Sequence, residues 1–197
     1  MSEGRPRRMF CFGLGYSAQV LARGLAAEGW QIAGTRRADK TDLKDCGYEI
    51  HRFDGSDPLD DPDKALAGTT HLLSSVPPSA SGDPVLACHA VDIEKIESLE
   101  WIGYLSTTGV YGDREGGWVD ESAELSPSGE RGRRRVVAEA AWFVLDTKAA
   151  VQSFRLAGIY GPGRSALDTV RQGRARRIVK PGQVFSRIHV DDIAKVL

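Results

Sequence analysis

The sequence predicts an α/β fold with a mainly parallel sheet. Short apolar segments typical of strands alternate with helical segments, and the alternation is sustained through six predicted strands up to residue 156. Such alternation is typical of sheets that carry helices on both faces. Within it, residues 9–37 form a strand, a glycine turn, a helix and a second strand. A dinucleotide-binding βαβ unit requires this order.

The glycine turn has the pattern Gly13-x-Gly15-x-x-Ala18. Gly13 permits a tight turn after the strand, and Gly15 lacks a Cβ, so a pyrophosphate can approach the backbone closely. Ala18 is small enough to let the helix and the strand pack together. We expect Tyr16 and Ser17, at the start of the helix, to contribute to the phosphate site, because free N–H groups and the helix dipole favour anions there.

The residues after the second strand predict the choice of cofactor. An NAD-binding unit has an Asp or Glu about 20 residues after the first glycine, where it binds the ribose 2′-hydroxyl. This chain has Thr35-Arg36-Arg37 instead. A guanidinium pairs with a 2′-phosphate in a bidentate way. The sequence therefore favours NADP, with NAD as the alternative if one or both arginines are only solvated.

The other elements follow from the apolar pattern and from turn residues. The helix that starts at residue 16 should end at Gly29 in a left-handed cap. Asp83 and Pro84 are expected to begin the helix at residues 84–99. Further strands are expected at residues 30–33, 48–53, 71–75, 101–106 and 150–156. Further helical segments are expected at residues 41–46, 58–67 and 133–144. The last of these should bury the apolar residues Val136, Val137, Ala140, Ala141 and Val144.

Two strand ends add candidates for the cofactor site. Asp54 ends the third predicted strand, where it either accepts a hydrogen bond from an adenine amine or caps the next helix. Ser75, Val76 and Pro77 end the fourth strand and open a Ser-, Gly- and Pro-rich loop. Such a loop at the carboxyl end of a central strand lies beside the ligand crevice in doubly wound sheets.

Composition limits the partners and the compartment. The formal net charge is −1, so no global field attracts nucleic acid or a membrane surface. No apolar run reaches the ~18 residues of a membrane-spanning helix. The three cysteines, Cys11, Cys46 and Cys88, fit no zinc motif and are expected to be free thiols in a reducing cytoplasm. We therefore expect a cytoplasmic protein with a small-molecule substrate and no bound metal, and a homodimer remains open.

Four further motifs combine with the glycine turn. They are Ser106-Thr-Thr-Gly-Val-Tyr-Gly112, the segment at residues 127–139, Arg155-Leu-Ala-Gly-Ile-Tyr-Gly-Pro-Gly163 and Ile188-His-Val-Asp-Asp-Ile-Ala194. In this order they resemble the extended short-chain dehydrogenases, the family of nucleotide-sugar epimerases and dehydratases. The resemblance covers nearly the whole chain.

The resemblance implies a domain organisation. It places an NAD(P)-binding Rossmann domain at residues 9–160 and, at residues 161–197, the beginning of a small C-terminal substrate domain with the segment that returns to the Rossmann domain. The polar residues 1–8 before it are expected to be a mobile lead. Members of the family usually continue well beyond the helix expected near Val190, so we expect the substrate domain to be incomplete.

The resemblance also implies catalytic positions, and the chain departs from them. The family's Ser or Thr at the end of the fifth strand corresponds to Thr107. Its Tyr-x-x-x-Lys pair falls, counted back from Glu139, on Arg131 and Arg135. In the family, the tyrosine exchanges a proton as hydride moves, and the lysine lowers the pKa of that tyrosine and holds the nicotinamide ribose. Arginine is a poor proton donor at neutral pH, although Arg135 can still donate to ribose hydroxyls and Arg131 can bind an anion.

The altered pair leaves two functional hypotheses. The first is an NADP-binding atypical short-chain dehydrogenase that transfers hydride to or from a small polar, nucleotide-sugar-like substrate. The second is a non-catalytic NADP-binding sensor or partner-binding module. Substitute proton donors would be Tyr111, Tyr160 or His189, each of which also has a structural interpretation. A second arginine cluster at residues 171–177 is expected to face an anionic substrate in part.

Overall fold

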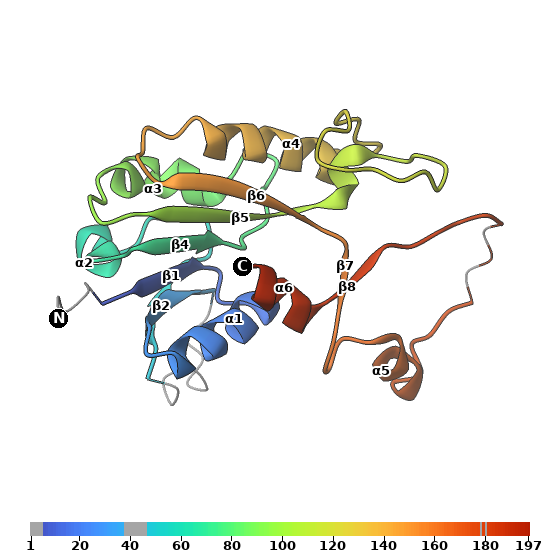
Figure 1. Cartoon of the computed structure of the whole chain (residues 1–197), viewed down its shortest axis with the longest axis horizontal. Helices are drawn as coiled ribbons and strands as arrows, with labels where there is room; N and C mark the ends of the chain where they lie inside the picture. The colour runs from blue at the N-terminus through green and yellow to red at the C-terminus, as the bar shows by residue number, and fades with distance from the viewer. Residues whose placement is uncertain (1–5, 38–46, 178, 180) are drawn as a thin grey trace.

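The computed structural model describes residues 6–37, 47–177, 179 and 181–197. Its main sheet has six strands in the order β3-β2-β1-β4-β5-β6, and every neighbouring pair is parallel (Figure 1). The strands are β1 Arg8–Phe12, β2 Gln31–Arg36, β3 Glu49–Arg52, β4 His71–Ser74, β5 Trp101–Thr107 and β6 Ala150–Leu156. This is the strand order of the doubly wound dinucleotide-binding fold. The predicted fold class is confirmed.

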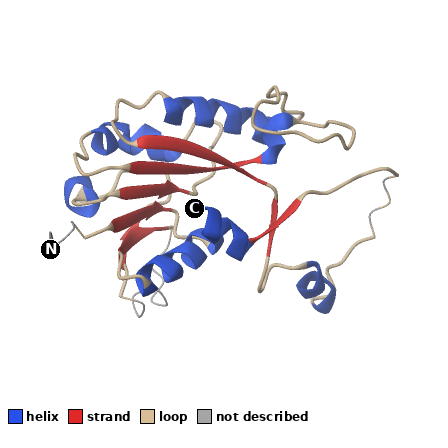
Figure 2. Cartoon of the chain, in the orientation of Figure 1, coloured by secondary structure: helices blue, strands red, loops and turns tan. Residues whose placement is uncertain are grey.

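Helices cover both faces of the sheet, as Figure 2 shows. They are α1 Tyr16–Ala27, α2 Pro62–Leu66, α3 Pro84–Glu94, α4 Glu130–Phe143 and α6 Val190–Val196. One apolar cluster joins α3 and α4 to the sheet through Val85, Ile93, Ala138 and Trp142. The other joins α1 and α6 to the opposite face through residues such as Leu21, Ala22 and Ala194. No helix within the described residues is both long enough and apolar enough to cross a bilayer.

The local signals at the helix ends agree with the structure. Gly29 has φ +85°, and the N–H of Trp30 donates to the carbonyl of Leu25, which closes α1 in a Schellman-type turn. Asp83 caps α3 by accepting from the N–H groups of Val85 and Leu86. The helical segment expected at residues 41–46 lies outside the described residues.

Strand β1 begins one residue earlier than expected. Arg8 belongs to β1 and is only 7% exposed. Its guanidinium donates to Thr69, to Glu49 and to the carbonyl of Ala65. Each of these bonds supplies a partner for the buried charge, so Arg8 is part of the folded sheet.

Helix α4 corrects two predictions from the sequence. It begins at Glu130, three residues before the predicted start, and its buried residues are Gly132, Ala138, Glu139 and Trp142. Val137 and Val144, which we expected inside, are 63% and 81% exposed. The apolar pattern failed because Glu139 and Trp142 find polar partners in the interior, in Arg155 and Asp83. Burial of these polar atoms is therefore compensated.

A separate arm leaves the end of β6. It contains the parallel strand pair β7 Gly158–Tyr160 and β8 Arg187–His189, with α5 Ala166–Arg171 between them. In Figure 1 the arm extends beyond the carboxyl ends of the main strands, and α6 then returns the chain to α1. That residues 161–197 form part of a substrate domain stays a prediction.

Candidate functional site

The glycine turn is held by the neighbouring strand. Gly13 has φ +81°, a left-handed conformation that favours glycine. Its N–H donates to Thr35 Oγ1, and the N–H of Leu14 donates to the Thr35 carbonyl, both at 2.8 Å. A Cβ on Gly13 would lie 2.8 Å from Ser75 Oγ. The turn therefore accepts only glycine at this position without rearrangement.

The start of α1 is open. Gly15 is its N-cap, and no side chain accepts a hydrogen bond from the first turn. A Cβ on Gly15 would meet only the Gly13 carbonyl oxygen, at 3.8 Å, so no protein atom fills the space beside it. Ala18 is fully buried against the sheet. The free N–H groups and the open space fit a bound phosphate.

A hollow of about 500 Å³ lies beside this turn, at the carboxyl ends of the first four strands. It contains most of the predicted cofactor residues: Gly13, Gly15, Arg36, Arg37, Asp54, Ser75, Val76 and Pro77. The predicted residues Tyr16, Ser17, Thr107 and Arg135 do not line it. The prediction did not include six further residues of the hollow: Leu14, Thr35, Phe53, Gly55, Ser79 and Pro84. Their signal was a position in the glycine turn, near the end of a strand, or in the segment that leads from β4 into α3.

Arg36, which lines this hollow, has a hydrogen-bond donor that is unpaired within the described part of the chain. It ends β2, and its Nε is buried without a hydrogen-bond partner among the described residues. Arg37 is exposed. Because an unpaired buried donor costs free energy, an oxyanion at Arg36 would be a favourable partner.

Asp54 does not cap the following helix, so that alternative is wrong. Asp54 accepts from the N–H and the hydroxyl of Ser56, and these bonds lower the pKa of its carboxyl group. The cap of α2 is Asp61, which accepts from the N–H of Lys64. Asp54 still lines the hollow, where its role toward adenine stays a prediction.

Tyr16 points away from the hollow and toward the arm. Its hydroxyl donates to the Pro162 carbonyl at 3.1 Å, and the Arg164 guanidinium lies 5.5 Å from the centre of its ring. Ser17 is buried. Any contribution of these two residues to phosphate binding would therefore come from their backbone N–H groups.

Thr107 is the last residue of β5, as its motif implied. Its Oγ1 accepts a hydrogen bond from the N–H of Gly109 at 3.2 Å, in the 3₁₀ turn η2, Thr108–Tyr111. The hydroxyl proton of Thr107 has no acceptor among the described residues. The side chain is thus oriented by the turn and can donate to a ligand.

Arg135 is bound to the strand that ends at Thr107. Its Nη1 donates to Tyr104 OH at 2.9 Å and to the Leu105 carbonyl at 2.6 Å. Tyr104 is fully buried and its ring stacks on Trp142, with centroids 5.8 Å apart. Burial raises the pKa of Tyr104 to about 12, so the phenol stays neutral at physiological pH. The guanidinium is therefore fixed near the end of β5 while Nη2 and Nε remain available.

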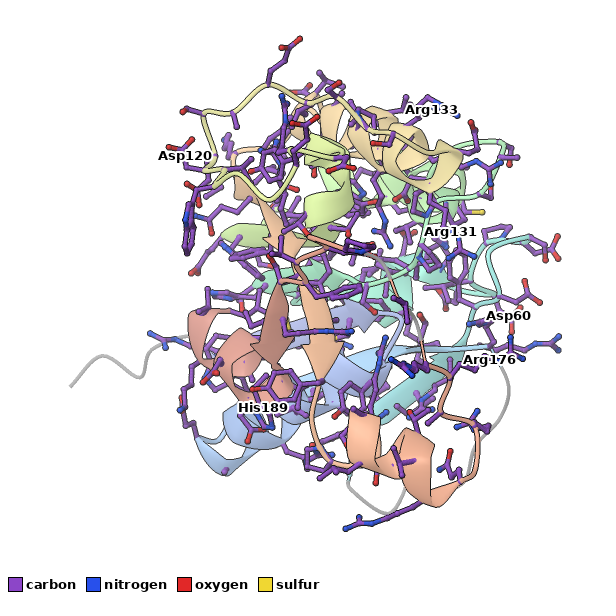
Figure 3. All side chains as sticks on the ribbon, turned by 90° about the vertical axis from the view of Figure 1, so that its right-hand side faces the viewer. Asp60, Asp120, Arg131, Arg133, Arg176 and His189 are labelled. Atoms are coloured by element: carbon purple, nitrogen blue, oxygen red, sulfur yellow. The ribbon has the colours of Figure 1, made fainter. Side chains whose placement is uncertain are left out.

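Arg131 lies one helical turn before Arg135 and is exposed. It forms no hydrogen bond or ion pair with any described residue, whereas Arg133 and Arg134 both pair with Glu130 at 3.1 Å. Figure 3, viewed toward the carboxyl ends of the strands, shows Arg131 on the sheet side of α4 and Arg133 on the outer side. Arg133 and Arg134 are thus neutralised by Glu130, whereas Arg131 and Arg135 form no ion pair with a described residue.

The alternative proton donors have other partners. Tyr111 is buried, and its hydroxyl accepts from Arg155 Nη1 at 2.9 Å. Tyr160 packs edge-on against His189, with centroids 5.0 Å apart. His189 accepts from the N–H of Asp191 at the start of α6. These contacts support the structural interpretation of all three residues.

The second arginine cluster borders another hollow, of about 840 Å³, in the arm. Four arginines line it: Arg164, Arg174, Arg176 and Arg187. None of them forms an ion pair with a described residue. Arg171 instead pairs with Asp168 at 3.8 Å, and neither Arg171 nor Arg177 lines the hollow.

Comparison with known proteins gives relatives but no family model that matches the chain. The chain is 30% identical over 175 residues to Protein YeeZ of Escherichia coli K12, covering 80% of this chain and 61% of YeeZ. A functionally unknown conserved protein from Silicibacter pomeroyi DSS superposes with a TM-score of 0.83 at 47% identity, over 96% of this chain and 66% of that one. The chain thus spans less than two thirds of either relative.

A third match carries a functional description. A protein from Methylobacillus flagellatus, assigned as an NAD-dependent epimerase/dehydratase, superposes with a TM-score of 0.63 at 25% identity, over 98% of this chain and 68% of that one. The chain therefore has the fold of the extended short-chain dehydrogenases, as its motifs predicted.

Proposed function

We propose that this chain is the cofactor-binding part of an NADP-dependent oxidoreductase of the short-chain dehydrogenase type. The observation that carries the proposal is the unpaired, buried Nε of Arg36 in a hollow beside an open glycine turn. The first turn of α1 would bind the pyrophosphate, and Arg36 with Arg37 would bind the ribose 2′-phosphate. Asp54 and the segment Ser75–Pro77 would border the adenine and the remaining cofactor.

The bound cofactor would supply or accept a hydride, and the chain would position the substrate. Thr107 is proposed to donate a hydrogen bond from its hydroxyl group to the reacting oxygen. Arg135 is proposed to stabilise negative charge nearby without giving up a proton, because an arginine guanidinium acts in proteins as a charged hydrogen-bond donor. In carbonyl reduction, hydride would add to carbon, and the proton on oxygen would come from water. Such catalysis should be slow.

Cofactor binding tests the first part. Calorimetry should show NADP binding about tenfold or more tightly than NAD, since a charge-assisted bidentate contact contributes about 1.5–3 kcal/mol. Arg36→Gln should abolish this preference. Arg23→Gln is the matched control, because Arg23 is exposed on α1 and does not line the hollow. Equal affinities of the wild type for both cofactors would reject the assignment of NADP.

Turnover tests the second part. NADPH consumption should be measured with a panel of ketones, 2-oxo acids and nucleotide sugars, on wild type, Thr107→Ala and Thr107→Ser. The serine variant should keep the slow activity and the alanine variant should lose it. Rapid turnover by the wild type that Thr107→Ala leaves unchanged would contradict the proposed site.

A non-catalytic NADP sensor is the second candidate. It is favoured by the two arginines in place of the family's proton-donating tyrosine and its lysine. This candidate predicts tight NADP binding with no turnover of any compound in the panel. The arginine-lined hollow in the arm favours the oxidoreductase, because it would suit the phosphates of a nucleotide-sugar-like substrate.

We also propose a homodimer through the outer face of α4. Val137, Phe143 and Val144 are 63%, 53% and 81% exposed on this helix. Light scattering should give the mass of a dimer, and Val144→Glu should shift the protein to monomer. A wild-type protein that stays monomeric at high concentration would exclude the proposed homodimer.

A further inference from the structure

We propose that Arg131 and Arg135 form an anion site beside Thr107, which binds a carboxylate or phosphate group of the substrate. This inference rests on the proposed function and specifies its substrate class. The two arginines lie four residues apart on α4, so their side chains leave the helix on one face. They occupy the turn of the helix that faces the end of β5.

Arg131 and Arg135 differ from the neighbouring arginines in that they lack an acidic ion-pair partner in the part of the chain that the structure describes. Arg133 and Arg134 both lie 3.1 Å from a Glu130 oxygen, and these hydrogen bonds lower the pKa of the Glu130 carboxyl group. Arg131 and Arg135 have no carboxylate partner among the described residues. Like charges at this spacing destabilise a helix, so the unpaired cations would gain from a bound anion.

Arg135 is held ready for a ligand. Its Nη1 is occupied by Tyr104 OH and the Leu105 carbonyl, which fix the plane of the guanidinium. Neither partner carries a charge, because burial keeps Tyr104 protonated. The cation is thus oriented without forming an ion pair, although it also interacts electrostatically with the buried carboxyl group of Asp83. Its other N–H groups can bind two oxygens of an anion.

Close packing places this turn of α4 against the Thr107 turn. A Cβ on Gly132 would lie 2.7 Å from the Gly109 carbonyl oxygen and 2.7 Å from Pro127 Cβ. Thr107 is two residues beyond Leu105 on the same strand, about 7 Å along it. An oxyanion on the arginine pair would therefore place an adjoining carbonyl group near Thr107. A 2-oxo acid or a phosphorylated ketone has this arrangement.

The test is anion binding by the full chain saturated with NADP, which fills the phosphate sites of the cofactor. Calorimetry at low salt would compare oxamate, a carboxylate, with inorganic phosphate and with neutral lactamide. Arg131→Gln should lower the affinity for the more tightly bound of the two anions tenfold or more. Arg134→Gln is the matched control, since it removes the same charge from the same helix, and it should change affinity less than twofold. Lactamide should not bind measurably.

A loss of anion binding in Arg131→Gln can be distinguished from a loss of the folded structure. Arg131 is exposed and contacts no described polar group, so Arg131→Gln should fold as the wild type does. The tighter anion should raise the melting temperature of the wild type and of Arg134→Gln but not of Arg131→Gln. The anion that binds more tightly, oxamate or phosphate, indicates whether the site at Arg131 and Arg135 binds a carboxylate or a phosphate group of the substrate.

Two results would overturn the anion site. Equal losses in Arg131→Gln and Arg134→Gln would mean that a diffuse positive field attracts the anion. Binding of NADP without binding of either anion would reject the site and leave the proposed function intact. Failure to bind NADP would instead reject the proposed function itself.

Discussion

Glu139 of α4 and Arg155 of β6 form a buried ion pair, with Arg155 Nη2 2.9 Å from Glu139 Oε2. The Glu139 side chain is only 3% exposed and that of Arg155 is 19% exposed. Arg155 also donates to Tyr111 OH, in the turn that follows Thr107. The ion pair therefore joins the helix of the arginine pair to the turn of the candidate catalytic threonine.

Removal of one partner should destabilise the fold strongly. Glu139→Leu leaves Arg155 buried without its counter-charge, and breaking a buried pair costs about 3–5 kcal/mol. We expect the lower end of this range, because part of Arg155 reaches water. Urea unfolding would measure the loss. The double variant Glu139→Leu, Arg155→Met should recover much of it, and a double variant no more stable than Glu139→Leu would contradict this account.

Substitution by alanine should change the free energy of unfolding in opposite directions at two glycines that lie in helices. Gly132→Ala would place a Cβ 2.7 Å from the Gly109 carbonyl oxygen, so we expect a loss of about 1–3 kcal/mol from overpacking. Gly24→Ala, in α1, meets no atom within 4 Å and should gain about 0.5–1 kcal/mol from helix propensity. Thermal unfolding of both variants checks this pair. A stabilised Gly132→Ala would show that α4 does not contact the turn so closely.

Tyr104 predicts a change of stability at alkaline pH. Burial raises the pKa of its phenol from 10.0 to about 12, so the folded state retains the proton longer than the unfolded chain does. This contribution is fully present below pH 10 and is lost as the pH rises toward 12. Tyr104→Phe should lose the hydrogen bond to Arg135, at about 1.5–3 kcal/mol near pH 7.

The role of Tyr104 can be tested by comparing how the free energy of unfolding depends on pH in the wild type and in Tyr104→Phe. The free energy of unfolding should fall more steeply between pH 10 and pH 12 in the wild type than in Tyr104→Phe, by roughly 2–3 kcal/mol in total. Parallel curves for the two proteins would mean that Tyr104 ionises as readily in the folded state as in the unfolded chain.

Paired substitutions test the orientation of α4. Val144→Gln replaces a side chain that is 81% exposed and, at a dilution where the chain is monomeric, should change stability by less than about 0.5 kcal/mol. Ala138→Gln replaces a side chain that is 2% exposed and should cost about 1–3 kcal/mol, because the larger polar group does not fit. Chemical denaturation would measure both. A larger cost for Val144→Gln than for Ala138→Gln would support the burial pattern predicted from the sequence instead.

The sequence by itself determined the elements whose signals are local. The turn at Gly13, the left-handed Gly29 and the Asp83 cap each depend on the conformation or hydrogen bonds of a few consecutive residues. Six apolar segments were enough to predict the parallel sheet, because buried strands need apolar side chains on both faces. The motif at Ser106–Gly112 likewise placed Thr107 at the end of β5.

Only the tertiary structure decided where the polar side chains of α4 point. The apolar pattern predicted Val137 and Val144 inside, yet the helix buries Glu139 and orients Arg135 because Arg155 and Tyr104 meet them from β6 and β5. Tyr16 turned toward the arm for a similar reason, since its partner Pro162 lies far away in the sequence. A buried polar group is stable only where a partner is present, and such partners are set by the packing of distant segments, which no local pattern contains.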